Sequence, residues 1–318
     1  MTVIQVSTIG VPEDYKTGLI PAICKNLGYQ IQWGKPEDCD ILIIGPFANL
    51  SKKRLGWCPK PLRPQVTVIN DVLRSILNRR KYAPLTLFHT GENIRHDFAN
   101  ADYSITFDLG ITNPKHFRLP YWMEMVDWSG EDVSGNLNPR YGRLLELSKL
   151  MEPLGVNFLK RPRSAALFAS HLREPRAKLL DVVKNQIAVT EFGKTFNPAI
   201  KNHLESGLIK YEALQDFAFN LCPENGMYPG YYTEKIPEAF MAGCLPITWA
   251  DENLKVDFNP NALINLAPMS WNEFSDLKDI LHSEKKLSAY AEQSLITKRP
   301  SLDPLKLYMK DMIETALS

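Results

Sequence analysis

Two predicted helices carry a cation in their first turn, where the positive end of the helix dipole disfavours one. In the first helix, Pro175 suits the first helical position and Arg176 follows it. In the second, Thr233 is the expected N-cap and Lys235 lies in the first turn. An anion held between each cation and the helix amides would remove the conflict. We therefore predict a diphosphate clamp formed by Arg176 and Lys235, with two unrelated surface cations as the alternative.

A carboxylate follows another predicted strand. The segment Thr90-Gly-Glu-Asn93 comes directly after the strand expected at 85–89. Ligands of open α/β sheets bind beyond the carboxyl ends of strands, which is where this segment places Glu92. The preceding glycine would let a ligand approach the backbone closely. Glu92 is thus a candidate functional carboxylate, and a polar turn residue is the alternative.

Familiar catalytic and metal-binding motifs are absent, since the sequence contains no GxGxxG, GxxxxGK[ST], HExxH or GxSxG pattern. Asp38-Cys39-Asp40 spells DxD, but it precedes the strand expected at 41–45 and so lies at the wrong end for a ligand. The five cysteines include no CxxC pair, which argues against a zinc site or a disulfide framework. We predict no bound metal and a reducing compartment.

The overall composition excludes several classes of protein. The 318 residues carry a net charge of +1, so bulk electrostatics do not favour nucleic acid or an acidic membrane surface. The first residues lack the charged and apolar regions of a signal peptide. No apolar run approaches the roughly 18 residues of a membrane-spanning helix. We expect a soluble cytoplasmic protein that contains two domains.

Short apolar runs alternate with helical patterns, which is typical of parallel α/β units. In the first half we expect strands at 3–7, 29–33, 41–45, 66–70, 85–89, 104–107 and 117–121, helices at 15–27 (interrupted at Pro21), 71–80 and 140–151, and a surface loop at 123–139. In the second half we expect strands at 164–170, 187–190, 217–221, 245–249 and 262–266. Helices are expected at 175–185, 209–214 and 233–243. A further helix should follow the capping box formed by Ser270 and Glu273, and the last helix should extend from Asp303 to the end.

This alternation predicts two Rossmann-like domains, at 1–155 and 156–318, with their cleft as the default ligand site. The last helix carries one apolar stripe and is a candidate to pack back on the N-terminal domain. Its stripe consists of Leu305, Met309, Met312 and Ala316.

Three blocks of the second half resemble the donor-site signature of the α-1,3/4-fucosyltransferases. They are Phe219-Asn-Leu-Cys-Pro-Glu-Asn225, Tyr231-Tyr-Thr-Glu-Lys-Ile236, and Ala239-Phe-Met-Ala-Gly243 with Pro246-Ile-Thr-Trp249. In the first half, Thr90-Gly-Glu-Asn93, Ala101-Asp-Tyr-Ser-Ile-Thr-Phe107 and Arg118-Leu-Pro120 resemble the first-domain blocks of the family. The strand at 166–170 with Arg176, and Gly193-Lys194 before Asn197, are similar to the entry of its donor domain. The resemblance extends over about 85–265.

The resemblance implies the GT-B fold, in which two Rossmann-like domains face each other across a cleft. It further implies an inverting transfer of fucose from GDP-fucose to an oligosaccharide containing Gal or GlcNAc, without a required metal or other cofactor. Glu92 would be the general base and Glu234 would lie near the fucose as a second catalytic carboxylate. The donor would be held by Arg176, Lys235, Asn225, Tyr231, Glu234 and Gly193. The identity of the acceptor and the choice between α-1,3 and α-1,4 linkage are left open, and so is a peripheral contact with the inner membrane.

This chain departs from the family pattern at three points. His171 replaces an asparagine, Pro223 replaces an aromatic residue, and Thr248-Trp-Ala250 replaces Tyr-Trp-Gly. These departures leave two alternatives open. One is a related transferase that uses another GDP-sugar, and the other is a non-catalytic two-lobed protein that binds a nucleotide or a sugar.

Overall fold

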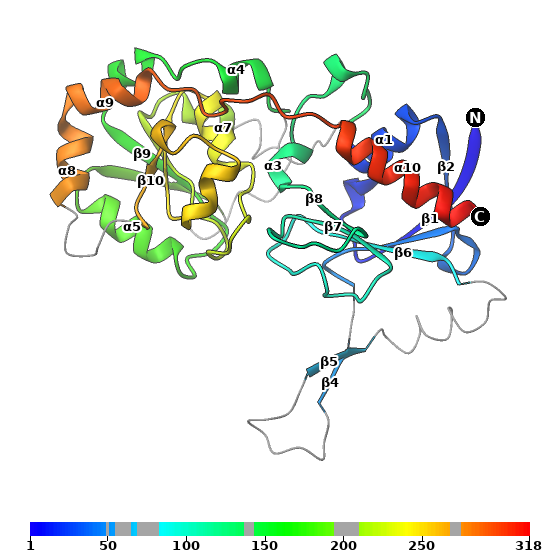
Figure 1. Ribbon diagram of the computed structural model, residues 1–318. Helices are drawn as coiled ribbons and strands as arrows, with labels where there is room; N and C mark the ends of the chain where they lie inside the picture. Colours follow the sequence, from blue (N-terminus) through cyan, green and yellow to red (C-terminus); the bar gives the residue numbers. More distant parts are fainter. Residues whose placement is uncertain (49–50, 55–64, 69–82, 137–142, 194–209, 268–274) are drawn as a thin grey trace. The chain divides into compact units, whose positions relative to one another are not determined.

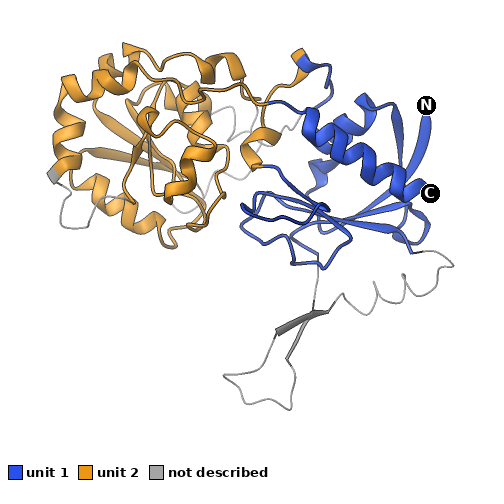
Figure 2. Ribbon diagram, viewed as in Figure 1, with its two compact units in different colours: residues 1–119, 131–136, 301–318 blue, residues 120–130, 137–300 orange. Residues whose placement is uncertain are grey.

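The computed structural model describes residues 1–48, 51–54, 65–68, 83–136, 143–193, 210–267 and 275–318 (Figure 1). The chain divides into two compact units, coloured separately in Figure 2. Unit 1 comprises Met1–Leu119, Glu131–Asn136 and Ser301–Ser318, and unit 2 comprises Pro120–Gly130 and Leu137–Pro300. The domain limits 1–155 and 156–318 stay a prediction. Among the described residues no helix is both long enough and apolar enough to cross a bilayer.

Unit 1 is built on a six-stranded sheet with the order β2-β1-β3-β6-β7-β8, in which every pairing is parallel. Its strands are β1 (Thr2–Ile9), β2 (Tyr29–Trp33), β3 (Ile41–Ile44), β6 (Leu85–His89), β7 (Tyr103–Thr106) and β8 (His116–Arg118). The continuous apolar run of β3 is buried at every position, as expected of a strand covered on both faces. β8 stops before Pro120, because a proline has no N–H to donate to a ladder.

One strand expected in the parallel sheet lies elsewhere. The strand predicted at 66–70 is β5 (Gln65–Val68), and it pairs antiparallel with β4 (Ser51–Arg54) in a separate two-stranded sheet. The helix predicted at 71–80 lies outside the described residues. The local apolar pattern therefore predicted the strand correctly, but the expected parallel pairing was wrong, because pairing depends on residues distant in the sequence.

Helices α1 (Leu19–Asn26) and α10 (Asp303–Leu317) lie side by side against the same sheet (Figure 1). The helix predicted at 15–27 is interrupted at Gly18 rather than at Pro21. A short 3-10 helix, η1 (Glu13–Thr17), precedes Gly18, and α1 begins after it. Pro21 thus falls in the first turn of α1, where its missing N–H removes no intrahelical bond. On α10, Leu305, Met309, Met312 and Ile313 are buried.

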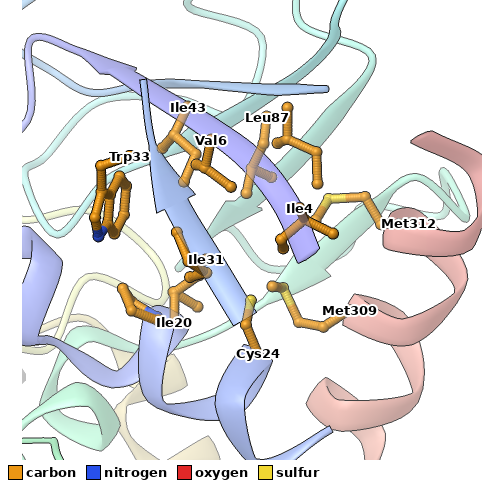
Figure 3. A pocket seen from close by; sticks show the side chains of 12 residues that line it. Ile4, Val6, Ile20, Cys24, Ile31, Trp33, Ile43, Leu87, Met309 and Met312 are labelled. Carbon is orange, nitrogen blue, oxygen red and sulfur yellow. The ribbon is translucent and has the colours of Figure 1, made fainter. Parts of the chain in front are cut away.

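The two helices and the sheet enclose a small apolar hollow (Figure 3). Its walls come from the first strands and from both helices, and include Ile4, Val6, Ile20, Cys24, Met309 and Met312. Burial raises the pKa of the Cys24 thiol to about 12, so this side chain packs as a small neutral group. The hollow belongs to the hydrophobic core that joins the end of the chain to its beginning.

Unit 2 has a five-stranded parallel sheet with the order β10-β9-β11-β12-β13. Its strands are β9 (Ser164–Phe168), β10 (Ala188–Phe192), β11 (Phe219–Leu221), β12 (Leu245–Thr248) and β13 (Ile264–Asn265). Its helices are α3 (Tyr121–Glu124), α4 (Leu147–Met151), α5 (Arg176–Lys184), α7 (Lys235–Met241), α8 (Ser275–His282) and α9 (Glu284–Ala291), and residues 210–214 are also helical. The capping box of Ser270 and Glu273 lies outside the described residues. Two parallel sheets with helices confirm the predicted α/β class.

Near the start of unit 2, one prediction was wrong and another was correct only in part. The expected surface loop at 123–139 contains the buried side chains of Met125, Val126 and Trp128, and Val126 forms a bridge with Leu145. The helix predicted at 140–151 is described as α4 at 147–151 only, with a strand-like bridge before it. Polar residues between these apolar ones led to the prediction of an exposed loop. Trp128 can nevertheless be buried, because its indole N–H donates a hydrogen bond to the Met123 carbonyl.

Candidate active site

The start of α7 is organised by a buried carboxylate. Glu224, which is 3% exposed, accepts hydrogen bonds from the Thr233 amide at 2.7 Å and from the Thr233 hydroxyl at 2.8 Å. The predicted role of Thr233 as N-cap is therefore wrong, because its hydroxyl is engaged by Glu224 and α7 begins at Lys235 with Glu234 in the capping position. Sequence reasoning missed Glu224, although it lies within the Phe219–Asn225 block.

Lys235 is held by the same carboxylate. Its Nζ donates to Glu224 Oε2 at 2.8 Å and to Thr233 Oγ1 at 2.7 Å, and it lies 3.7 Å from Glu234 Oε1. Burial works to lower the pKa of Lys235, but the carboxylates of Glu224 and Glu234 outweigh it and raise that pKa. The ammonium is therefore charged and fixed in place at neutral pH. This arrangement explains how a cation is tolerated at the start of the helix.

Arg176, which is 4% exposed, begins α5, with Pro175 as the N-cap. Its Nη2 donates to Asn225 Oδ1, and its Nη1 lies 3.2 Å from His171 Nε2. Burial, with the positive charges of Arg176, Arg173 and Lys235, lowers the pKa of His171. A neutral imidazole has one acceptor nitrogen, and two donors face this ring: the Arg173 amide, 3.3 Å from Nδ1, and the Arg176 guanidinium.

The loop after β11 therefore joins the two predicted cations. Glu224 binds Lys235 and its neighbour Asn225 binds Arg176, so adjacent residues hold side chains that are far apart in sequence. Parallel strands bring these loops to one edge of the sheet, since β9 and β11 are paired neighbours. The structure thus brings together four of the predicted donor-site residues: Arg176, Asn225, Glu234 and Lys235.

The other two predicted donor residues have structural roles in the described chain. Tyr231 is buried, and its amide donates to the Tyr228 carbonyl at 3.0 Å. Gly193 directly follows β10 with φ +116°, and a Cβ at this position would lie 2.3 Å from the Ala169 carbonyl oxygen. The close approach of the chain after β9 therefore requires glycine here. Donor contacts by Tyr231 and Gly193 stay predictions.

Thr248, one of the departures from the family pattern, has a structural role. Thr248 is fully buried, and its hydroxyl donates to the Cys222 carbonyl at 2.9 Å. This hydroxyl is used within the sheet region of unit 2. His171, in contrast, touches Arg176 directly and is the departure that bears on the charge of the site.

A second ion pair, missed by the sequence reasoning, lies on α7. Lys210 Nζ binds Glu238 Oε2, and only 14% and 12% of the two side chains are exposed. Burial would raise the pKa of Glu234, but the charges of Lys235 and Lys210 outweigh it and lower that pKa. Glu234 is therefore ionised. No local pattern marks Lys210, because its partner lies on another element.

In unit 1, Glu92 lies in a tight turn after β6. The Thr90 hydroxyl accepts from the Glu92 amide at 2.9 Å, and the Ile94 amide donates to the Glu92 carbonyl at 2.6 Å. His89, the last residue of β6, is buried, and its Nδ1 lies 2.9 Å from the Tyr15 hydroxyl. These bonds fix the backbone of the turn and leave Glu92 at the carboxyl end of the strand, where the sequence placed it.

The rest of that turn is fixed by Asp108, which sequence reasoning missed. This carboxylate is 3% exposed and accepts from Arg95 Nη1 at 3.1 Å, from the His96 amide at 2.9 Å and from the Thr106 hydroxyl at 2.8 Å. Arg95 also donates to Asn93 Oδ1. Asp108 follows β7, so two neighbouring strand ends support the Glu92 turn.

The DxD sequence is structural in this fold. Asp40 Oδ2 accepts from the Gln5 amide at 2.8 Å, Cys39 is buried, and both precede β3. Within the described ranges, no group of three or more His, Cys, Asp or Glu residues is arranged to hold a metal ion.

Comparisons with known proteins connect both units to one family. Residues 73–125 match the family model described as the alpha-(1,3)-fucosyltransferase FucT N-terminal domain. Residues 158–292 match glycosyltransferase family 10 (fucosyltransferase), C-terminal part. The first range contains Glu92, and the second contains Arg176, Asn225, Glu234 and Lys235.

Individual relatives agree with these matches. The chain is 29% identical over 219 residues to an alpha-(1,3)-fucosyltransferase FucT of Helicobacter pylori, a match that covers 63% of this chain and 44% of that protein's length. A crystal structure of an alpha1,3-fucosyltransferase matches with a TM-score of 0.66 at 23% identity, covering 99% of this chain and 90% of the other. A structure titled as that enzyme with GDP-fucose matches with a TM-score of 0.64 at 22% identity, covering 100% and 91%. These structures share the fold of this chain.

Proposed function

Because the chain belongs to glycosyltransferase family 10, the fucosyltransferases, we propose that it transfers L-fucose from GDP-fucose to a hydroxyl of a GlcNAc-containing glycan of the N-acetyllactosamine type. The linkage formed is α-1,3 or α-1,4, and the reaction inverts the anomeric carbon. The observation that supports this most directly is the pair of fixed cations, Arg176 and Lys235, joined by the loop after β11.

In this proposal Arg176 and Lys235 bind the diphosphate of the donor. Negative charge grows on the diphosphate as the bond from the anomeric carbon to oxygen breaks. Cations that are already fixed stabilise this charge more than they stabilise the bound donor, and they do so without reorganisation. Glu224 and Asn225 provide the fixation, and a diphosphate would share the two cations with them.

Two carboxylates, one in each unit, have further proposed roles. Glu234, ionised and buried, accepts a hydrogen bond from a hydroxyl of the fucose. Glu92 is the general base: it takes the proton of the acceptor hydroxyl as that oxygen bonds to the anomeric carbon and GDP leaves with the electron pair. Positioned proton transfer contributes on the order of 10²–10⁴-fold to such a rate. The proposal requires that an acceptor bound near Glu92 reach the donor during turnover.

The leaving-group charge is assigned to side chains, so we propose that the reaction requires no divalent cation. Transfer measured in excess EDTA, compared with transfer in added Mg²⁺ or Mn²⁺, checks this directly. A rate that falls by tenfold or more in EDTA and returns with the metal would contradict it.

The function itself is tested by incubating the pure protein with a panel of GDP-sugars and an N-acetyllactosamine acceptor. We expect GDP release that depends on both GDP-fucose and the acceptor, and a product heavier by one fucose. Transfer from another GDP-sugar instead would establish the related transferase, which the contact of His171 with Arg176 motivates. GDP-fucose binding without turnover on any β-galactoside or GlcNAc acceptor would favour a non-catalytic binding protein.

A further inference from the structure

We propose that Lys210 is a positioning residue for the donor sugar, because it neutralises Glu238 and thereby keeps the neighbouring Glu234 ionised and available to the sugar. This inference rests on the proposed function, in which Glu234 meets the fucose. Lys210 touches no substrate in this account and acts only through the carboxylates of α7.

The position of Lys210 is well defined. Its ammonium binds Glu238 Oε2 and lies 5.8 Å from the centre of the Phe168 ring at the end of β9. Phe168 ends β9 and precedes the loop that leads to His171 and Arg176. Lys210 therefore lies close to the end of the strand from which the proposed donor-binding loop begins. A buried charge is retained at such a place only with a partner, and Glu238 is that partner.

Without Lys210, the carboxylate of Glu238 would repel that of Glu234. It lies one helical turn after Glu234, with the Glu238 amide donating to the Glu234 carbonyl at 2.9 Å. Glu234 and Glu238 are 5% and 9% exposed, so two carboxylates that share one side of the helix are both removed from water. Like charges at this spacing repel, and burial strengthens the effect.

The other cation near Glu234 is already engaged. Lys235 Nζ lies 2.8 Å from Glu224 and 3.7 Å from Glu234, so its single positive charge is shared between these two carboxylates. The neighbouring Tyr231 and the Cys222 thiol supply no positive charge, and burial raises the pKa of Cys222 so that it stays protonated. Lys210 and Lys235 thus face three carboxylates, and loss of Lys210 would drive a proton onto Glu238 or Glu234.

Burial raises the pKa of Glu238 despite Lys210, whereas the two cations lower the pKa of Glu234. Protonation is therefore favoured at Glu238, although Lys210 binds it directly, and ionisation is favoured at Glu234. The presence of Lys210 therefore reserves the ionised state for the residue assigned to the donor sugar.

The decisive experiment compares Lys210→Met with the matched Lys210→Arg. We expect Lys210→Met to weaken GDP-fucose binding and lower kcat/KM by about 10- to 100-fold, the range for a hydrogen bond to a charged group. GDP lacks the sugar, so its affinity, measured by calorimetry, should change less than about threefold. Lys210→Arg should retain most of the activity, and the acid limb of the kcat/KM profile should move to higher pH in Lys210→Met.

A second variant separates positioning from simple packing. Adding Glu238→Gln to Lys210→Met removes the repelling charge and should return the acid limb of the kcat/KM profile toward its original pH. A merely structural ion pair would regain stability in the double variant, but its acid limb would not have moved in either variant. If Lys210→Met does not fold, Glu238→Gln alone carries the test: its acid limb should move to lower pH, and an unmoved limb would overturn the proposal.

Two outcomes are distinguishable. If the unaltered protein transfers fucose and Lys210→Met does so equally well, or loses GDP and GDP-fucose affinity to the same extent, the positioning role is wrong and the function stands. If the unaltered protein transfers no fucose, the proposed function is wrong, and an equal loss of GDP-fucose and GDP affinity from the unaltered protein to Lys210→Met would overturn the positioning role as well.

Discussion

Replacing Glu224 with glutamine is the sharpest test of how the site is held. The change preserves shape but removes the charge and replaces one acceptor oxygen with an NH₂ group. That group would face either the Thr233 amide or the Lys235 ammonium, which now lie 2.7 Å and 2.8 Å from carboxylate oxygens. Donors would then face donors in a place where Glu224 is 3% exposed.

The expected cost follows from these contacts. Removing one partner of a buried ion pair costs about 3–5 kcal/mol. Lys235 keeps part of its compensation, because 18% of its side chain is exposed and Glu234 lies 3.7 Å away. We therefore expect a cost below this range, about 2–3 kcal/mol in the free energy of unfolding.

Urea unfolding at neutral pH measures this difference. The matched control is Glu252→Gln, at an exposed position in η7 (Glu252–Val256), for which we expect a change within about 0.5 kcal/mol. Added GDP should stabilise Glu224→Gln more than the unaltered protein, because the diphosphate supplies Lys235 with the lost negative partner. A variant as stable as the control, or one that gains nothing extra from GDP, would refute the reasoning.

Three further predictions concern individual residues. Glu92→Gln should lose nearly all transfer, by about 10²-fold or more, while GDP affinity by calorimetry stays unchanged; full activity would remove Glu92 as the base. Arg176→Ala and Lys235→Ala should each weaken GDP binding by about tenfold or more, and unaltered GDP affinity in both would exclude the clamp. His171 has a pKa lowered from 6.5, so the unfolded chain binds a proton more readily than the folded one. Stability contributed by this ring is thus present above pH 6.5 and is lost as pH falls through the depressed pKa of the folded state. Urea midpoints at successive pH values should therefore fall less steeply below neutrality for His171→Gln, and an identical slope would contradict the assignment.

Local sequence was sufficient where the physical cause is local. The continuous apolar run 41–44 predicts a strand buried on both faces, and β3 is that strand. The places of Glu92 and Arg176 were predicted because both follow strands, and in parallel sheets chain order itself puts such segments at the carboxyl edge.

The same reasoning failed where neighbours in space decide the outcome. Thr233 is a residue type favoured at an N-cap, but its hydroxyl donates a hydrogen bond to the carboxylate of Glu224, nine positions earlier. Trp128 sits in a polar stretch that reads as a surface loop, yet it is buried because its indole N–H reaches a carbonyl inside. Propensity describes what a residue can do, and the nearest partner selects among these options.

The sequence by itself determined the α/β class, the family resemblance, and the presence of an unfavourable cation at Lys235, since periodicity, motif spacing and position in a helix are all local properties. Only the tertiary structure decided what that cation touches. Glu224 holds Lys235, Asn225 holds Arg176 across 49 positions, and Lys210 reaches Glu238 across 28. The last two pairings join segments that follow different strands, and the first closes the loop between β11 and α7. The energy of a buried charge depends on which partner the fold brings within hydrogen-bonding distance.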